Sequence, residues 1–203
     1  MTSFVQRIYR KLAYGKPVVV VSGLPRSGTS MTMKMLDAGG VSIVTDELRK
    51  ADEDNPKGYF ELEKIKDLEK DPDKSWLVDA RGKAIKVISF LLKELPATNN
   101  YKVLFMNRNL DEILASQAKM LDRRGESSET SDDKMKELWE DHLWKIKYRI
   151  KRQSHFELIE LHYKEVLGNP AGEAKRIRDF TGLDLDVEKM AGVVDEQLYR
   201  NRR

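Results

Sequence analysis

The chain has 203 residues, of which 40% are apolar and 35% are charged, and its net charge at pH 7 is +3. This length and apolar content predict one domain, residues 1–203, with a core of its own. The small net charge argues against a polybasic nucleic-acid-binding protein, and the lack of cysteine excludes disulfides, thiolate metal sites and a cysteine nucleophile. We therefore expect no nucleic acid as a partner and a location in the reducing cytoplasm.

The first segment, from Phe4 to Lys16, is amphipathic and basic. Arg7, Arg10 and Lys11 interrupt its apolar stretches, so no secretory signal is predicted, and no run in the chain is long enough for a transmembrane segment. The segment either lies on a membrane surface or forms a first helix that packs on a sheet. The second interpretation is the expectation.

The next segment has the pattern of a strand, a tight loop and a helix. Val18–Val21 are four β-branched residues in a row, which is typical of a strand buried on both faces. The glycines Gly23 and Gly28 punctuate the following loop, and a helical pattern runs from Met31 to Ala38. Such a loop aims the unpaired N–H groups of a helix N-terminus at one point and forms a phosphate or sulfate cradle.

The glycine spacing of this loop, with a hydroxyl residue two positions after the second glycine, is that of a P-loop. However, Thr29 stands where a kinase or ATPase has its lysine, and Arg26 supplies a positive charge instead. The alternative is a glycine turn that binds nothing. The candidate cradle residues are Arg26, Ser27, Gly28, Thr29 and Ser30.

The rest of the chain alternates apolar runs with helical patterns, which predicts an α/β fold with a mainly parallel sheet between two helical layers. Further strands are predicted at Val41–Val44, Trp76–Val78, Val103–Met106 and Phe156–Leu161. Apolar stripes predict two more helices, over residues 110–121 and 135–150. Thr130 and Asp133 resemble a capping box before the second of these helices, and the polar stretch between the two is predicted to be a surface loop.

A second candidate site follows the strand Val103–Met106. Arg108 comes at the end of this strand, and Ser116 lies two helical turns further on, outside the apolar stripe of its helix. An arginine and a serine near the carboxyl edge of the sheet are suited to a second phosphate group. By itself this pair is weak evidence, because surface arginines at strand ends are common, and the ordinary interpretation as surface polar residues is the expectation.

Together the two segments resemble the sulfotransferase family. Pro25–Ser30 is similar to the family's loop for the 5′-phosphosulfate, and Arg108–Asp111 with Ser116 is similar to its 3′-phosphate site. Tyr163–Leu167 and Ile177–Leu183 resemble two further family segments. The resemblance spans residues 18–183 and is to a small, bacterial-type member, which implies a P-loop fold of three α/β/α layers.

The resemblance implies an enzyme that moves a sulfuryl group from 3′-phosphoadenosine 5′-phosphosulfate (PAPS) to a hydroxyl or amine. The product nucleotide is adenosine 3′,5′-bisphosphate (PAP), and no metal is required. Arg26 to Ser30 would hold the 5′-phosphosulfate, Arg108 and Ser116 the 3′-phosphate, and Tyr163 the adenine. Arg26 would also be catalytic, because it stabilises the charge on the leaving 5′-phosphate.

A general base is also implied, and the histidines found in cytosolic members have no counterpart at the matching position. The segment around Glu47 resembles the tyrosylprotein sulfotransferase branch, which uses a glutamate there, so Glu47 is the preferred base and Glu61 the second choice. Lys83 and Lys86 either neutralise the bridging oxygen or, as expected, are solvated helix lysines.

Several alternatives remain open at this stage. A kinase with an altered P-loop would need a carboxylate for magnesium, for which Asp79 is a weak candidate, and a non-catalytic nucleotide-binding relative is a further hypothesis. The acceptor is not predicted. The C-terminal arginines, or Lys119 with its neighbours, are the candidates to cover the nucleotide. Trp139 and Trp144 are either core residues or the contact face of a homo-oligomer.

Overall fold

The computed structural model describes residues 4–46, 60–123, 125–126 and 130–195. In this part of the chain, four parallel strands form one sheet in the order β2-β1-β3-β4. The strands are β1 (Val18–Gly23), β2 (Ala84–Lys86), β3 (Tyr101–Asn107) and β4 (Phe156–His162). In the register of the two central strands, Val20 lies opposite Val103.

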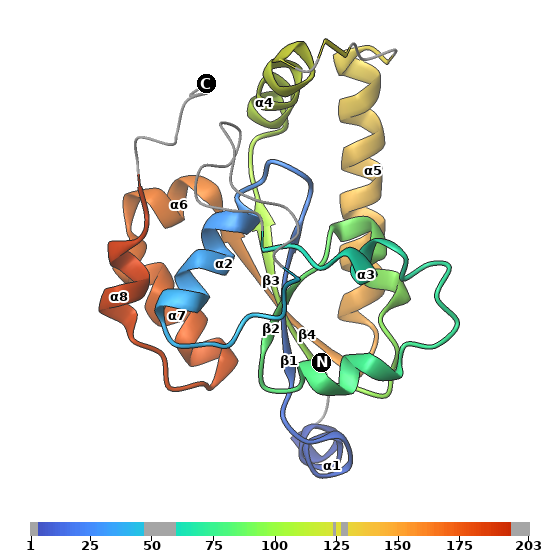
Figure 1. Ribbon diagram of the computed structural model, residues 1–203, viewed down its shortest axis with the longest axis vertical. Coiled ribbons are helices and arrows are strands. Elements are labelled where there is room, and N and C mark those ends of the chain that lie inside the picture. The colour runs from blue at the N-terminus through green and yellow to red at the C-terminus, as the bar shows by residue number, and fades with distance from the viewer. Residues whose placement is uncertain (1–3, 47–59, 124, 127–129, 196–203) are drawn as a thin grey trace.

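Helices cover both faces of this sheet (Figure 1). One layer contains α2 (Thr29–Ala38), α6 (Tyr163–Gly168), α7 (Pro170–Thr181) and α8 (Val187–Gly192). The other contains α3 (Glu63–Lys66), α5 (Asp132–Lys151) and the 3-10 helices η1 (Ser75–Ala80) and η2 (Ser89–Glu94). The predicted three-layer α/β/α fold is therefore confirmed.

The alternation along β1 divides the core in two. Val19 and Val21 face α2 and α6–α8, whereas Val18 and Val20 face α5 and the 3-10 helices. All four valines are fully buried, as expected for a central strand. A smaller cluster joins Trp139 of α5 to α4 (Leu110–Arg123), so Trp139 is a core residue, whereas Trp144 is 65% exposed.

Three of the five predicted strands are confirmed, and two are wrong. Trp76–Val78 belongs to the 3-10 helix η1, and Val41–Val44 contributes one isolated bridge, from Ile43 to Ala84. The sheet instead recruits Ala84–Lys86. The cap of α5 also differs, because Ser131 accepts the hydrogen bond from the Lys134 N–H.

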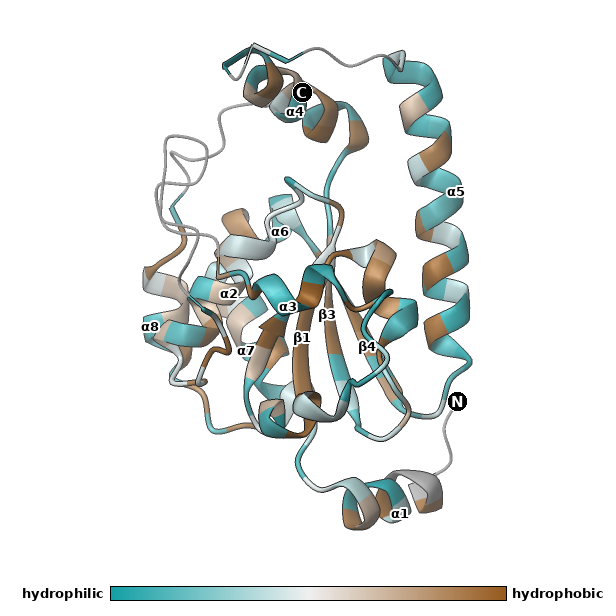
Figure 2. Ribbon diagram, turned by 45° about the vertical axis from the view of Figure 1, so that its right-hand side comes forward, coloured by the Kyte–Doolittle hydropathy of each residue, from teal (hydrophilic) through white to brown (hydrophobic). Residues whose placement is uncertain are grey.

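The first helix, α1 (Phe4–Tyr14), does not pack on the sheet as expected. It lies below the amino ends of the strands, apart from both helical layers (Figures 1 and 2). None of the helices in the described part of the chain is long and apolar enough to span a membrane.

Candidate functional site

The loop between β1 and α2 forms a tight cradle at the carboxyl edge of the sheet. Ser27 closes it by donating its Oγ–H to the Leu24 carbonyl oxygen at 2.7 Å. Gly28 is the N-cap of α2 and has φ +105°, a conformation that favours glycine. The first N–H groups of a helix have no partner within it and can bind an anion, and α2 begins at Thr29 in this loop.

Gly28 is also required for close packing. A Cβ at this position would lie 2.6 Å from Cδ2 of Tyr163, whose ring is 6% exposed at the start of α6. The cradle therefore packs so closely against α6 that position 28 has no room for a side chain.

We expect Gly28→Ala to destabilise the protein more than Gly40→Ala, which is a matched control. Gly40 has φ +95°, but a Cβ there would meet nothing within 4 Å. Both variants carry a left-handed-backbone penalty of about 1–2 kcal/mol, and Gly28→Ala adds an overpacking penalty of about 1–3 kcal/mol. Urea unfolding measures the difference, and equal losses in both variants would contradict the proposed close contact.

The second predicted segment meets the cradle directly. Arg108, just after β3, donates from Nη1 to the carbonyl oxygen of Arg26 at 3.1 Å. Its Nε donates to Glu112 at 3.0 Å, and its guanidinium carbon lies 4.3 Å from the centre of the Tyr163 ring. The Arg108 side chain is 8% exposed, so its position is fixed by packing.

Arg26 completes the connection from the other side. Its backbone φ is +68°, and its Nε donates to the Ser116 Oγ at 3.0 Å. Ser116 is 6% exposed on α4. The structure therefore brings together the cradle and both members of the second motif, with one arginine bridging them.

Glu112 is a buried member of the candidate site that the sequence did not reveal. Its side chain is fully buried, and Arg108 and Lys164 both pair with it, at 3.0 and 3.4 Å. The only signal in the sequence was the four-residue spacing of Arg108 and Glu112, because Arg108 lies two residues before α4 begins. Glu112 therefore orients the guanidinium of Arg108 at the site.

The expectation that Lys86 is a solvated helix lysine is wrong. It ends β2 at the carboxyl edge of the sheet, and its side chain is 9% exposed. Its Nζ lies 3.3 Å from the Ser30 Oγ and 3.2 Å from Glu61 Oε1. Lys86 thus brings an ammonium group to the start of α2, whereas Lys83 lies exposed at the amino edge.

The preferred base, Glu47, lies outside the described residues, and so do the C-terminal arginines. The two residues before Glu47 are described, and both contact Glu61. Thr45 Oγ donates to the Glu61 carbonyl oxygen at 2.7 Å, and the Asp46 N–H donates to the same oxygen at 3.3 Å. Thr45 and Asp46 therefore lie beside Glu61, whose carboxylate contacts Lys86.

The magnesium candidate Asp79 and two of the histidines take structural positions. Asp79 does not end a strand, because it belongs to the 3-10 helix that precedes the amino end of β2. His142 stacks on Phe90 at 3.8 Å and contacts the buried Ser89 hydroxyl, and burial lowers its pKa. Burial likewise lowers the pKa of His155 to about 4. Both histidines therefore pack as structural residues.

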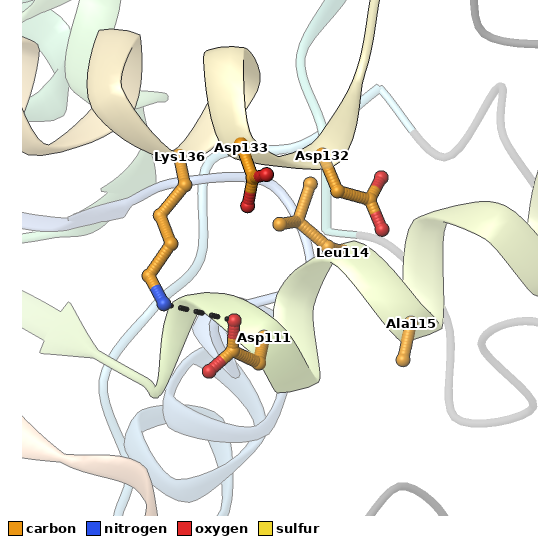
Figure 3. A pocket seen from close by; sticks show the side chains of 6 residues that line it. All are labelled: Asp111, Leu114, Ala115, Asp132, Asp133 and Lys136. Atoms are coloured by element: carbon orange, nitrogen blue, oxygen red, sulfur yellow. Dashed lines mark hydrogen bonds and ion pairs between the residues drawn. The ribbon is translucent and has the colours of Figure 1, made fainter.

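A separate hollow lies between α4 and α5 (Figure 3). Three carboxylates line it, from Asp111, Asp132 and Asp133, and Lys136 pairs with the first of them at 3.0 Å. This balance of charge is unfavourable for a phosphate or sulfate ligand, so the cradle remains the candidate site.

Comparison with known protein families gives one match over nearly the whole chain. Residues 16–203 match the family model described as the sulfotransferase domain. A comparison with curated proteins finds no significant relative.

Several solved structures share the fold. The sulfotransferase domain from the curacin biosynthetic pathway is 14% identical, with a TM-score of 0.51 over 86% of this chain and 76% of that one. Mouse sulfotransferase SULT7A1 complexed with PAP is 18% identical over 89% of this chain and 63% of that one, also with a TM-score of 0.51. Sulfotransferase STF1 from Mycobacterium tuberculosis H37Rv is 15% identical over 94% and 74%, with the same TM-score of 0.51.

Proposed function

Because this chain belongs to the sulfotransferase domain family, we propose that the cradle and the Arg108–Ser116 pair hold the two phosphate ends of PAPS. Membership makes the protein a transferase that uses PAPS and releases PAP. The single observation that carries the site assignment is the bridge between the two motifs. Arg26 Nε donates to Ser116, while Arg108 donates to the Arg26 carbonyl oxygen.

The residues present fit the donor. Thr29 and Ser30 add hydroxyl groups at the start of α2, and Arg26 and Arg108 offer planar guanidinium groups suited to phosphate oxygens. Tyr163 is proposed as an adenine contact on the family resemblance, and its packing against Gly28 and Arg108 supports a positioning role as well.

When bound, PAPS supplies a sulfuryl group that passes to the acceptor oxygen or nitrogen as the bond from sulfur to the 5′-phosphate oxygen breaks. Arg26 and the N-terminus of α2 are proposed to stabilise the charge on that phosphate. Lys86 is proposed to assist them, because its ammonium group is held beside Ser30. Glu47 is proposed to accept the proton of the acceptor, with Glu61 as the second choice.

We further propose that the enzyme works in the cytoplasm, with which a chain lacking cysteine is compatible. If copies of the chain associate, the exposed Trp144, which stacks on Tyr148, is the proposed contact.

The first test is thermal stability with PAP, compared with AMP and with ATP plus magnesium. PAP at 100 times its dissociation constant is expected to add about 2.7 kcal/mol of stability, which raises Tm by roughly 5–10 °C for a chain of this size. The rise should need no metal. A rise with magnesium-ATP alone would contradict the donor assignment and favour a kinase.

Arg108→Ala is expected to weaken PAP binding by about 10- to 100-fold, because it removes charge-assisted hydrogen bonds to the 3′-phosphate. AMP, which lacks that phosphate, should bind almost as before. Calorimetric titration of both nucleotides measures the difference, and equal weakening would contradict the 3′-phosphate assignment.

Loss of Arg108 also leaves the buried Glu112 without its closest cation, which destabilises the fold. The double variant Arg108→Ala with Glu112→Gln is the control, since it also removes the buried charge that Arg108 pairs with. We expect it to regain stability but not the preference for PAP over AMP.

A further inference from the structure

The helix α1 is attached to the domain through Arg10. The Arg10 Nε donates to the Asn100 Oδ1 at 2.7 Å, and its Nη2 donates to the carbonyl oxygens of Ala97 and Asn99, both at 2.9 Å. Asn100 Nδ2 donates back to the Arg10 carbonyl oxygen at 2.9 Å. These partners precede β3, so Arg10 marks the side of α1 that faces the amino edge of the sheet.

The opposite side of α1 is apolar and exposed. Leu12 lies about 160° around the helix from Arg10, and Val5, Ile8 and Tyr9 share the side of Leu12. The exposed fractions are 82% for Leu12, 72% for Val5, 66% for Tyr9 and 46% for Ile8. Four large exposed side chains gathered on one helix face, on the side away from the attached Arg10, indicate an interaction surface.

The charge around this face is positive. Residues 1–36 contain no Asp or Glu, whereas Arg7, Arg10, Lys11 and Lys16 lie in or beside α1. Lys11 and Lys16 are exposed, and so is Lys83 at the amino end of β2. An apolar helix face with basic residues at its margins complements the anionic headgroups and acyl chains of a bilayer.

We propose that α1 binds the surface of an anionic lipid bilayer, with its apolar face inserted among the headgroups and with Lys11 and the neighbouring Lys16 on lipid phosphates. A second copy of the chain fits less well. The helix is roughly 16 Å long, too short to bury the roughly 800 Å² per partner typical of stable dimers, and two copies would bring like charges together. The proposal does not rest on sulfuryl transfer.

The test is flotation of the full chain with phosphatidylcholine vesicles, with and without about 30% phosphatidylserine. The wild-type chain should float with the anionic vesicles, bind the neutral ones at least about tenfold more weakly, and dissociate as salt rises. Ile8→Ser with Leu12→Ser should weaken anionic binding by about 10- to 100-fold. Lys11→Glu should also weaken it while leaving the apolar face intact.

Leu138→Ser is the matched control, because Leu138 is an exposed leucine (49%) on α5, and it should bind like the wild type. Circular dichroism and Tm should be unchanged in all variants, which separates lost binding from lost folding. The proposal is overturned if the wild type fails to float, or if the Ile8 and Leu12 variant binds normally. It is also overturned if sedimentation shows a vesicle-independent dimer that the same variant abolishes.

Discussion

Replacing Arg26 with alanine is expected to lower kcat/KM by about 100- to 1,000-fold, the typical loss when a preorganised donor to developing charge is removed. Arg26 lies at the junction of both phosphate motifs, bonded through its side chain to Ser116 and through its carbonyl oxygen to Arg108. The rate is measured as PAP released from PAPS with the acceptor that supports the fastest turnover.

The backbone of Arg26 allows a control for folding. At φ +68°, alanine and lysine share the left-handed penalty of the native residue, whereas glycine does not. We expect Arg26→Gly to be about 1 kcal/mol more stable than Arg26→Ala and equally inactive. Arg26→Lys keeps the charge but loses the fork, so its rate should be intermediate. A rate within twofold of wild type for Arg26→Ala would exclude the proposed role.

Glu47→Gln is expected to lower kcat by about 100- to 10,000-fold, because a glutamine cannot accept the proton of the acceptor. PAP affinity should change little, since Glu47 is not proposed to touch the nucleotide. Steady-state rates and PAP titration of the same preparation measure the two effects. The choice of Glu47 is supported by the two residues that precede it, because Thr45 and Asp46 both donate hydrogen bonds to the Glu61 carbonyl oxygen.

Glu61→Gln is the comparison that separates the two glutamates. Glu61 pairs with Lys86 at 3.2 Å and with Lys66 at 3.9 Å, so its proposed part is to hold the Lys86 ammonium group near the cradle. Its loss should lower the rate less than the loss of Glu47. Normal turnover in Glu47→Gln together with inactivity in Glu61→Gln would move the base to Glu61.

Two of the three strands that the sequence predicted correctly have continuous apolar runs, whereas the third, Phe156–Leu161, contains two glutamates. Val18–Val21 and Val103–Met106 are buried on both faces, so their hydrophobicity is continuous. The prediction of a strand at Trp76–Val78 was wrong because three apolar residues fit a short helix as well as a strand. The structure uses Leu77 to fill the core below η1. Ala84–Lys86 was missed because it is short and flanked by lysines.

Part of the candidate site could also be predicted from the sequence. Glycine spacing located the cradle, Arg108 was found from its place at the end of a strand, and Ser116 from its place outside the apolar stripe of the next helix. The bond from Arg26 to Ser116 and the burial of Lys86 against Ser30 are tertiary contacts between distant segments. Such contacts follow from sheet order, which no local pattern specifies.

The strand order has a consequence for how the protein folds. Each pairing of the described strands joins distant segments, as Val20 with Val103 and Leu104 with Ile159 illustrate. Large loops must therefore close before the sheet stabilises itself, which places folding toward the slow, millisecond-to-second end of the range for small domains. The two phosphate motifs meet only once β1 and β3 have paired. A nucleotide bound there would thus prolong the lifetime of the native state without hastening its formation.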